Sequence, residues 1–476
     1  MLSTGLVAID ATVIATAVPS IVQTLGGFAE FPWLFSVYLL AQAVTVPVYG
    51  KLADVFGRKP VMLFGIGLFL AGSVLSGLST SMNMLIAFRT LQGLGAGAMQ
   101  PVSLTIIGDI YTLEQRAKVQ GVFSGVWGLA GLVGPLTGGL IVKYLTWHWV
   151  FFINVPVGLG AFALLVFFFH EQVQHKPQKL DYVGAVLLSA GVVALLFGVQ
   201  GIGRNLLGLP VGAVLLAAFV WVERRVASPI IPMSIFKNPA ITISAVAGAL
   251  FSAAMFGATT YVPLYVQGVL GGSPTLAGGM ITPMIVGWPV ASLFAGRLLL
   301  KTGFRPLIVG GLGLTVIGTG AMALLLKPES SLLIPELGMA LFGIGLGFTA
   351  TSLLIAVQTS VGWELRGVAT ASHMFFRTVG GALGVGLMGG VVVSQLLKDP
   401  SVPLAAANEL LGPEHGRGLS PAVFQTLSGA LGTGLTINFW IICAATVGAF
   451  AAGLFFPKVK RGEGVTVSST DVAAPH

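Results

Sequence analysis

The sequence predicts an all-α polytopic membrane protein in which fourteen transmembrane helices are arranged as six, two and six. Three observations carry this prediction: the composition, the lengths of the apolar runs, and a repeat between the two halves of the chain. Hydrophobic residues make up 55% of the 476 residues, charged residues only 8%, and the mean hydropathy is +0.94. Soluble domains carry about 25% charged residues, so most of this surface cannot face water.

The chain contains apolar runs that are long enough to cross a bilayer. About 20 mostly apolar residues span the roughly 30 Å of hydrocarbon, and such runs are typical of helices rather than of barrel strands. The predicted spans are 2–24, 31–50, 60–79, 83–110, 118–142, 147–169, 182–201, 206–223, 238–268, 276–299, 306–326, 332–361, 369–397 and 432–456. The first run follows no basic residues and carries polar ones, so we interpret it as a retained helix and not as a cleaved signal peptide.

The basic residues predict the orientation of the chain. Most of the 24 Lys and Arg residues fall in connections on the side that would hold both termini. Positive residues concentrate on the cytoplasmic side of a membrane, so we expect both termini, including a tail at 458–476, in the cytoplasm of a bacterial inner membrane. The net charge of +8 then reflects topology and contact with membrane lipids, and no nucleic acid is expected as a partner.

An internal repeat pairs the first six spans with the last six. GKLADVFGRKP at 50–60 aligns with GRLLLKTGFRP at 296–306, and glycines in 93–97 fall opposite glycines in 343–347. Repeats of this kind are typical of transporters. The two unpaired spans are then an insertion. The predicted domains are an N-terminal six-helix bundle (1–170), two inserted helices with flanking loops (171–236), a C-terminal six-helix bundle (237–457) and the tail.

Four sequence motifs lie in the first half of the chain. D-x-T-V-x-x-x-A-x-P occupies 10–19, G-x-L-A-D-x-x-G-R-K occupies 50–59, R-x-x-Q-G-x-G-x-G occupies 89–97 and G-P-x-x-G-G occupies 134–139. With these motifs the chain resembles, over essentially its whole length, the fourteen-helix drug:proton antiporters of the major facilitator superfamily. The resemblance implies multidrug efflux driven by the proton gradient, with no cofactor. In the run WHWVFFINVP, His148 stands where this branch usually has Arg.

The 50–59 loop is predicted to be a conformational latch. Its glycines suit a tight reversal between helices, and its basic residues suit cytoplasmic lipid head groups. Asp54 is placed to pair with Arg58 or Arg116, or to cap a helix N-terminus across the bundle interface; the alternative is that these charges only anchor the topology. The residues expected to form the latch are Gly50, Asp54, Gly57, Arg58, Lys59 and Arg116.

The antiporter motif consists of Gly134, Pro135, Gly138 and Gly139. Small residues let helices approach closely in a bilayer, and the proline removes a backbone donor and bends its helix. Close packing alone is one interpretation. The resemblance implies a second, in which this segment lies at the bundle interface and resists leak.

Asp10 is the deepest acidic residue of the predicted spans. A carboxylate at this depth costs about 3 kcal/mol on insertion scales and is a functional candidate by default, and the repeat places Ala254 opposite it. We expect Asp10 to couple transport to protons, with Arg89 tuning it as the resemblance implies. A structural polar pair, or a shallower position, is the alternative. Glu336, next to Pro335, is a further coupling candidate or a boundary residue.

Polar and aromatic residues within the spans are expected to line a substrate cavity. They are Tyr38, Gln42, Gln92, Asn154, Tyr261, Trp288, Gln358 and Arg377. Arg377 would neutralise an acidic group or bind anionic atoms of a substrate. His373, one turn earlier, is interpreted as structural.

Together these features favour a monomeric secondary transporter that exports lipophilic or cationic small molecules in exchange for protons by alternating access. An exporter of lipids or envelope precursors on the same scaffold is the alternative, which the long connection 398–431 would favour. A receptor or an enzyme is disfavoured, because the sequence has neither a G-x4-G-K-[S/T] phosphate loop nor a catalytic or metal-binding constellation. Its one cysteine, Cys443, excludes a disulfide framework within the chain.

Overall fold

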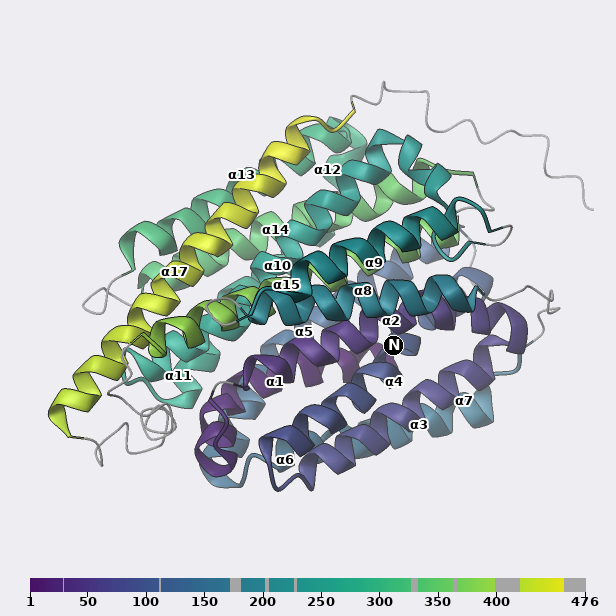
Figure 1. Ribbon diagram of the computed structural model, residues 1–476. Coiled ribbons are helices and arrows are strands. Elements are labelled where there is room, and N and C mark those ends of the chain that lie inside the picture. The colour runs from purple at the N-terminus through teal and green to yellow at the C-terminus, as the bar shows by residue number, and fades with distance from the viewer. Residues whose placement is uncertain are drawn as a thin grey trace, which may run out of the picture.

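The computed structural model describes residues 1–457 apart from residue 29 and the segments 111–112, 172–180, 202–204, 227–228, 327–332, 363–365 and 399–419. Every regular element in these residues is helical (Figure 1). In chain order the elements are α1 (Leu2–Leu25), α2 (Pro32–Phe56), α3 (Arg58–Gly77), α4 (Met82–Ile110), α5 (Leu113–Tyr144), α6 (Trp149–Phe152), α7 (Asn154–Phe168), α8 (Tyr182–Gln200), α9 (Gly208–Glu223), the 3-10 helix η1 (Met233–Lys237), α10 (Pro239–Gly268), α11 (Pro274–Gly279), α12 (Thr282–Thr302), α13 (Phe304–Leu325), α14 (Leu333–Thr359), α15 (Arg366–Leu396) and α17 (Pro421–Leu454).

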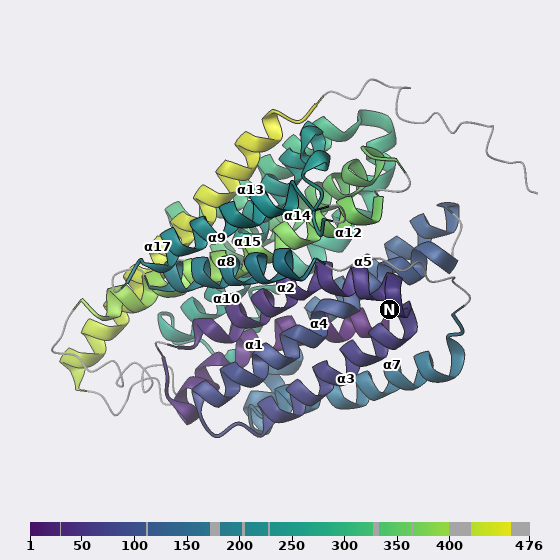
Figure 2. The same cartoon turned by 45° about the vertical axis from the view of Figure 1, so that its right-hand side comes forward.

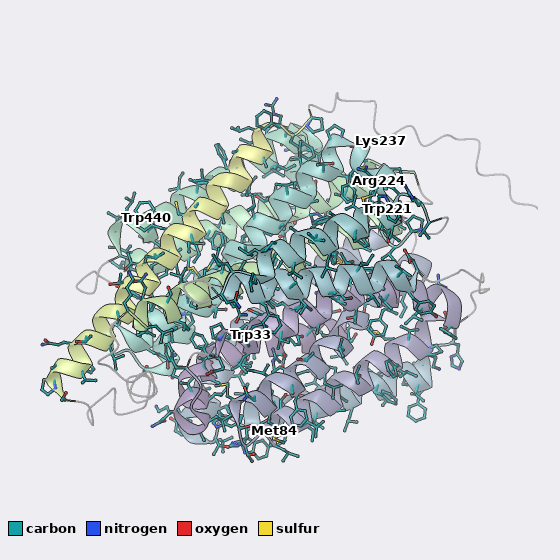
Figure 3. The ribbon with its side chains drawn as sticks, viewed as in Figure 1. Trp33, Met84, Trp221, Arg224, Lys237 and Trp440 are labelled. Atoms are coloured by element: carbon teal, nitrogen blue, oxygen red, sulfur yellow. The ribbon has the colours of Figure 1, made fainter. Side chains whose placement is uncertain are left out.

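Most of these helices are long and apolar, as a bilayer requires. Within the described residues, 11 helices have the length and hydropathy to cross a membrane, and the apolar stretches 128–144 and 208–223 are shorter. Large apolar side chains such as Phe168 and Trp440 are exposed; Trp440 lies on the outside of α17 (Figure 3). Hydrocarbon offers the backbone no hydrogen-bond partners, so helices are the expected solution. The all-helical, multi-pass prediction is confirmed, while the count of fourteen spans stays a prediction.

The helices form two groups with a hairpin beside them. Helices α1–α7 pack with one another, and α10–α17 do the same (Figure 1, Figure 2). Helices α8 and α9 pair, and α8 contacts both α2 and α15. The predicted domain boundaries fall in the connections on either side of this hairpin. The division of the chain into independent domains stays a prediction.

Packing reflects the repeat between the two halves. Gly57 and Gly303 occupy matched positions, each as a single residue between two helices, and their φ angles are 99° and 83°. Glycine adopts this left-handed conformation without strain. In α4, Gly95 lies directly against the backbone of α3, and in α14, Gly345 lies against the backbone of α13. Equivalent glycines therefore make equivalent close approaches in the two groups.

The two groups are in apolar contact at one end, here termed the α1–α2 end because it carries that connection. There Phe31 packs edge-on against Tyr261, with ring centroids 6.4 Å apart, and Pro32 fills the space beside Gly389. The opposite end, termed the α2–α3 end, carries Met1 and the α2–α3 connection. The aromatic contact therefore closes the gap between the two groups at the α1–α2 end.

Candidate functional site

An ion pair lies inside the N-terminal group of helices. Asp10 on α1 accepts a hydrogen bond from Arg89 on α4, with 2.6 Å between Oδ2 and Nη1, and both side chains are only 1% exposed. The Arg89 Nε also donates to the Leu34 carbonyl of α2 over 3.2 Å. Its guanidinium carbon lies 4.1 Å from the ring centroid of Tyr38, a cation–π contact. Two donated hydrogen bonds and a ring contact thus orient Arg89 toward one carboxylate oxygen.

Three neutral side chains complete what we call the Asp10 network, which consists of Asp10, Arg89, Gln92, Asn154 and Ser73. Asp10 Oδ1 accepts from Gln92 Nε2 at 2.8 Å and from Asn154 Nδ2 at 2.9 Å. Gln92 Oε1 accepts from Arg89 Nη1 at 2.7 Å, and Asn154 Nδ2 also donates to Ser73 Oγ at 3.0 Å. The network therefore joins α1, α3, α4 and α7.

The energetics of this network depend strongly on its charges. Removing one partner of a buried ion pair costs about 3–5 kcal/mol, because it leaves the other charge uncompensated. Protonation of Asp10 would likewise remove its negative charge and weaken its interaction with Arg89. Two polar atoms beside it, the Tyr38 hydroxyl and Asn154 Oδ1, are buried and have no hydrogen-bond partner in the described part of the chain. The site thus has spare hydrogen-bonding capacity for an alternative arrangement.

Sequence reasoning identified most of this network, but not its connections. Asp10 and Arg89 were expected to act together, and they are bonded. Tyr38, Gln92 and Asn154 pack around the Asp10–Arg89 pair, and their expected contact with a substrate stays a prediction. Ser73 was not anticipated, because a serine on an apolar helix carries no signal of its partner.

The antiporter motif lies between α1 and the second group of helices. A Cβ on Gly138 would lie 2.6 Å from the Val13 carbonyl of α1, and Gly134 lies against Thr12 of the same helix. On its other side, the carbonyl of Pro135 is 2.8 Å from the position of a Cβ on Gly278 of α11. Gly139 is buried beside them. Helix α5 therefore bridges the helix that carries Asp10 and the second group.

The predicted latch loop has a partner that the sequence did not indicate. Glu171, just beyond α7, accepts from the backbone N–H of Arg58 at 2.7 Å and of Lys59 at 3.1 Å. Lys59 Nζ donates to the Val166 carbonyl at 2.9 Å. A carboxylate at the first N–H groups of a helix satisfies orphan donors and complements the helix dipole. The predicted pairing of Asp54 with Arg58 or Arg116 lies outside the described residues.

The remaining predicted residues do not join the Asp10 network. Glu336 lies half-buried in the first turn of α14. Tyr261 is buried at the α1–α2 end, where its hydroxyl donates to the Val385 carbonyl at 2.8 Å. Gln42 is buried on α2, whereas Trp288 and Gln358 are half-buried on α12 and α14. Arg377 lies on α15, in the second group.

His148 lies between α5 and α6, outside the helices. Its ring stacks on Trp147 with a centroid separation of 3.8 Å, and partial burial lowers the pKa of the imidazole. Burial thus disfavours the positive charge that the arginine expected from the resemblance would bring to this position.

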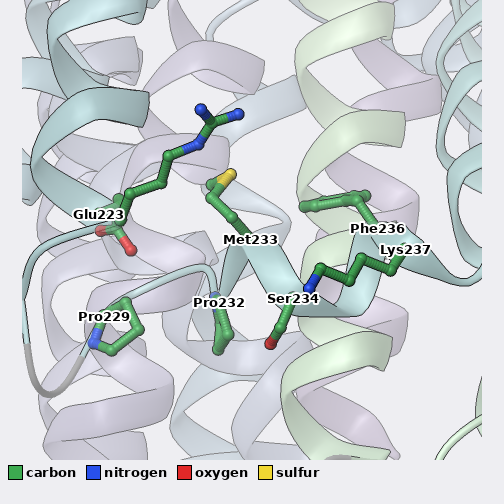
Figure 4. A pocket seen from close by; sticks show the side chains of 8 residues that line it. Glu223, Pro229, Pro232, Met233, Ser234, Phe236 and Lys237 are labelled. Atoms are coloured by element: carbon green, nitrogen blue, oxygen red, sulfur yellow. The ribbon is translucent and has the colours of Figure 1, made fainter.

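An open hollow of about 570 Å³ lies at the α2–α3 end, between α9 and η1 (Figure 4). Glu223 folds the α9–α10 connection by accepting from the backbone N–H groups of Ile230 and Ile231, each at 3.1 Å. Arg224 and Lys237 are exposed here, on the same side as Trp221 (Figure 3). None of these side chains belongs to the Asp10 network. Among the described residues, no group of three His, Cys, Asp or Glu is placed to hold a metal ion.

Two repeated groups of membrane-length helices, the first of which encloses a buried ion pair, are typical of helical secondary transporters. The chain belongs to the Major Facilitator Superfamily, whose family model matches residues 1–385. It is a transporter and not an enzyme.

Curated relatives with efflux names match most of the chain. The multidrug transporter protein MdtP of Bacillus subtilis is 39% identical over 85% of this chain and 77% of its own. Multidrug resistance protein 3 of the same species is 34% identical over 95% of this chain and 93% of its own. The efflux pump dotC of Dothistroma septosporum is 31% identical over 95% of this chain and 82% of its own.

Solved structures share the fold at low identity. An auto-inhibited peptide transporter of the POT family has a TM-score of 0.65 at 17% identity, over 98% of both chains. A bacterial homologue of the human lysosomal transporter Spinster, in an inward-facing and unoccupied conformation, has a TM-score of 0.65 at 17% identity, over 95% of both chains. At this identity, the likeness concerns the fold alone.

Proposed function

We propose that this chain exports lipophilic small molecules in exchange for protons, and that Asp10 carries the proton. The observation behind the proposal is the buried Asp10–Arg89 pair with its hydrogen-bonded neighbours. Arg89 Nη1 and a proton compete for the same carboxylate, so binding of a proton releases the arginine. An ionisable group at this depth, held by exchangeable bonds, is typical of proton relays in transporters.

The position of α1 links this exchange to alternating access. Asp10 lies on α1, which packs on the glycines of the antiporter motif, and α5 in turn contacts α11 and α12 of the second group. A shift of α1 on protonation would therefore be passed to the contact between the two groups. Rocking of the two groups about a central site is the mechanism expected of such folds. The 50–59 loop, with Gly50, Asp54 and Arg116, would act as the latch.

The names of the relatives support a drug-like cargo, since they are described as multidrug transporters and efflux pumps. We further propose a monomer with fourteen spans in the inner membrane of a bacterium, with both termini in the cytoplasm. It would need no cofactor, and the proton gradient would be its energy source. The alternative cargo, lipids or envelope precursors, would be favoured by the long connection 398–431. Most of this connection lies outside the described residues.

The test is transport by the purified protein in liposomes under an imposed pH gradient. Gradient-dependent uptake of ethidium and of a neutral lipophilic dye is expected for the wild type and is expected to be lost in Asp10→Asn. Glu336→Gln is measured beside it, because Glu336 is the other predicted coupling residue and lies outside the Asp10 network. If Asp10 alone carries the proton, the loss is confined to Asp10→Asn. Undiminished gradient-dependent uptake by Asp10→Asn would refute the assignment of Asp10.

A further inference from the structure

The hollow between α9 and η1 is bordered by two basic side chains (Figure 4). Arg224, which follows α9, and Lys237, the last residue of η1, both line it and are both exposed. No carboxylate of the described residues forms an ion pair with either. The acidic side chains nearby are Glu223 and Asp181, which are only 3% and 8% exposed. The open side of the hollow is therefore positively charged.

The walls of the hollow are held by contacts that do not involve these two cations. Glu223 fixes the α9 side through its bonds to the backbone of the α9–α10 connection. On the other side, Phe236 of η1 packs edge-on against Phe376 of α15, with ring centroids 5.7 Å apart. Asn238, which follows η1, donates to the Ser360 carbonyl at 2.9 Å. Arg224 and Lys237 thus stay available to a ligand.

Helix α9 leads to the hollow along an exposed apolar face. Its exposed large side chains Leu207, Val211, Val214 and Trp221 recur at spacings of three, four and seven residues, which place them on one face of a helix. In a bilayer this face contacts acyl chains. Trp221 lies at its end, and the guanidinium carbon of Arg225 lies 4.0 Å from the Trp221 ring centroid.

The hollow therefore lies at the level of the lipid head groups. Tryptophan is enriched at the boundary between membrane and water, and Trp221, Arg224 and Lys237 lie together at this end of the molecule (Figure 3). A ligand that reaches the hollow from the membrane would combine an anionic group with apolar chains.

We propose that the hollow binds the phosphate of an anionic phospholipid, such as phosphatidylglycerol, whose acyl chains lie along the exposed face of α9. A guanidinium binds phosphate through two parallel N–H bonds, and an ammonium binds it as a point charge. The exposed hydroxyl of Ser234 supplies a neutral donor in the same hollow. A soluble organic phosphate would offer the same anionic group but would leave the apolar face without a partner.

A lipid in this position would bridge two parts of the fold. Arg224 belongs to the inserted hairpin of α8 and α9, whereas Lys237 lies two residues before α10 of the second group. Basic pockets beside membrane-spanning helices are typical sites for anionic head groups. The site contains no residue of the Asp10 network, so the inference goes beyond the proposed function and does not depend on proton coupling.

The test is native mass spectrometry of the full-length protein in a neutral detergent. Titration with phosphatidylglycerol, and separately with phosphatidylcholine of the same acyl chains, gives the dissociation constant of the first bound lipid. The wild type is expected to bind phosphatidylglycerol at least about tenfold more tightly, the value of one charge-assisted hydrogen bond. Asp10→Asn is expected to show the same preference, so failure of proton-driven transport is distinguishable from failure of this site.

The double variant Arg224→Gln/Lys237→Gln is expected to lose this preference. It should keep the affinity for phosphatidylcholine and the melting temperature of the wild type, because both side chains are exposed. Arg297→Gln/Lys301→Gln is the matched control, since it removes the same charge from exposed positions on α12. The control is expected to keep the preference.

Three results would overturn the proposal. The first is equal affinity of the wild type for the two lipids. The second is an equal loss of preference in the two double variants, because total charge rather than this hollow would then decide binding. The third is displacement of phosphatidylglycerol by glycerol 3-phosphate at an equal concentration, because the site would then recognise a soluble phosphate and not a lipid.

Discussion

Asp10 holds its position through three donors from three side chains, two on Oδ1 and one on Oδ2. Hydrogen bonds to an ionised group are stronger than those between neutral groups, so these donors fix the orientation of the buried carboxylate. Asn154 is the one that reaches Asp10 from α7, and it is itself held by Ser73. A donor of this kind can be removed without changing the charge of the site.

Asn154→Ala is expected to lower the rate of gradient-driven uptake at least about tenfold, because the carboxylate loses its donor from α7 and a hydrogen bond to a charged group contributes about 1.5–3 kcal/mol. The measurement is the initial rate of uptake under a fixed pH gradient. Asn438→Ala is the control, since that buried asparagine donates to the Met388 carbonyl on another helix and its loss should leave the rate close to that of the wild type. An undiminished rate in Asn154→Ala would show that this donor does not act on the proton-carrying group.

Among the elements, α5 links the two groups of helices, because it touches α1 on one side and α11 and α12 on the other. Three of its glycines leave no free space: Gly134 and Gly138 face α1, while Gly131 faces Ile285 of α12. Small residues at such contacts let helices slide past each other in a bilayer. A bulkier residue would hold α1 and α5 apart.

Gly138→Ala is expected to lower both the melting temperature and the rate of proton-driven transport. The added methyl group would overpack the contact with α1 and displace that helix, which is expected to slow transport at least about tenfold. Gly160→Ala on α7 is the matched control, because a Cβ there meets no atom within 4 Å. That change is expected to be neutral or to stabilise the helix by about 1 kcal/mol. Melting temperature and uptake are measured for both variants; equal behaviour of the two would contradict a role for this close contact.

Several features of the fold and site could be predicted from local sequence patterns. Apolar runs determine where helices form in a bilayer, and the matched glycines at 57 and 303 predict two equivalent reversals, both of which are present. Contacts between distant positions were not accessible in this way. Glu171 caps α3 across 113 positions of sequence separation, and Asn154 reaches Asp10 across 144. Periodicity specifies the face on which a side chain lies, but not the partner that packing brings to it.

At the scale of the whole molecule, the closed α1–α2 end depends on aromatic packing between the two groups. Phe28 and Phe31, both from the connection between α1 and α2, pack together at 5.3 Å, and Phe31 reaches Tyr261 of α10. Phe31 is fully buried. Alternating access requires that this contact form in one conformation and break in the other, so its strength biases the equilibrium between them.

Phe31→Ala is therefore expected to shift the protein toward a conformation open at the α1–α2 end, because it removes the contact with Tyr261 that joins the two groups. Loss of a buried phenylalanine costs about 3–5 kcal/mol, and the part due to this contact falls on the closed state. Spin labels on Thr24→Cys and Gln425→Cys, in a Cys443→Ser background, report the separation of the groups at this end, where both labelled residues are exposed. The distance distribution is expected to lengthen in Phe31→Ala. Phe69→Ala removes an equally buried ring within the first group and is expected to lower stability without lengthening the distance. If both variants kept the wild-type distribution, the aromatic contact would not control closure, and the bias would have to reside in the contacts of α5 and α15 instead.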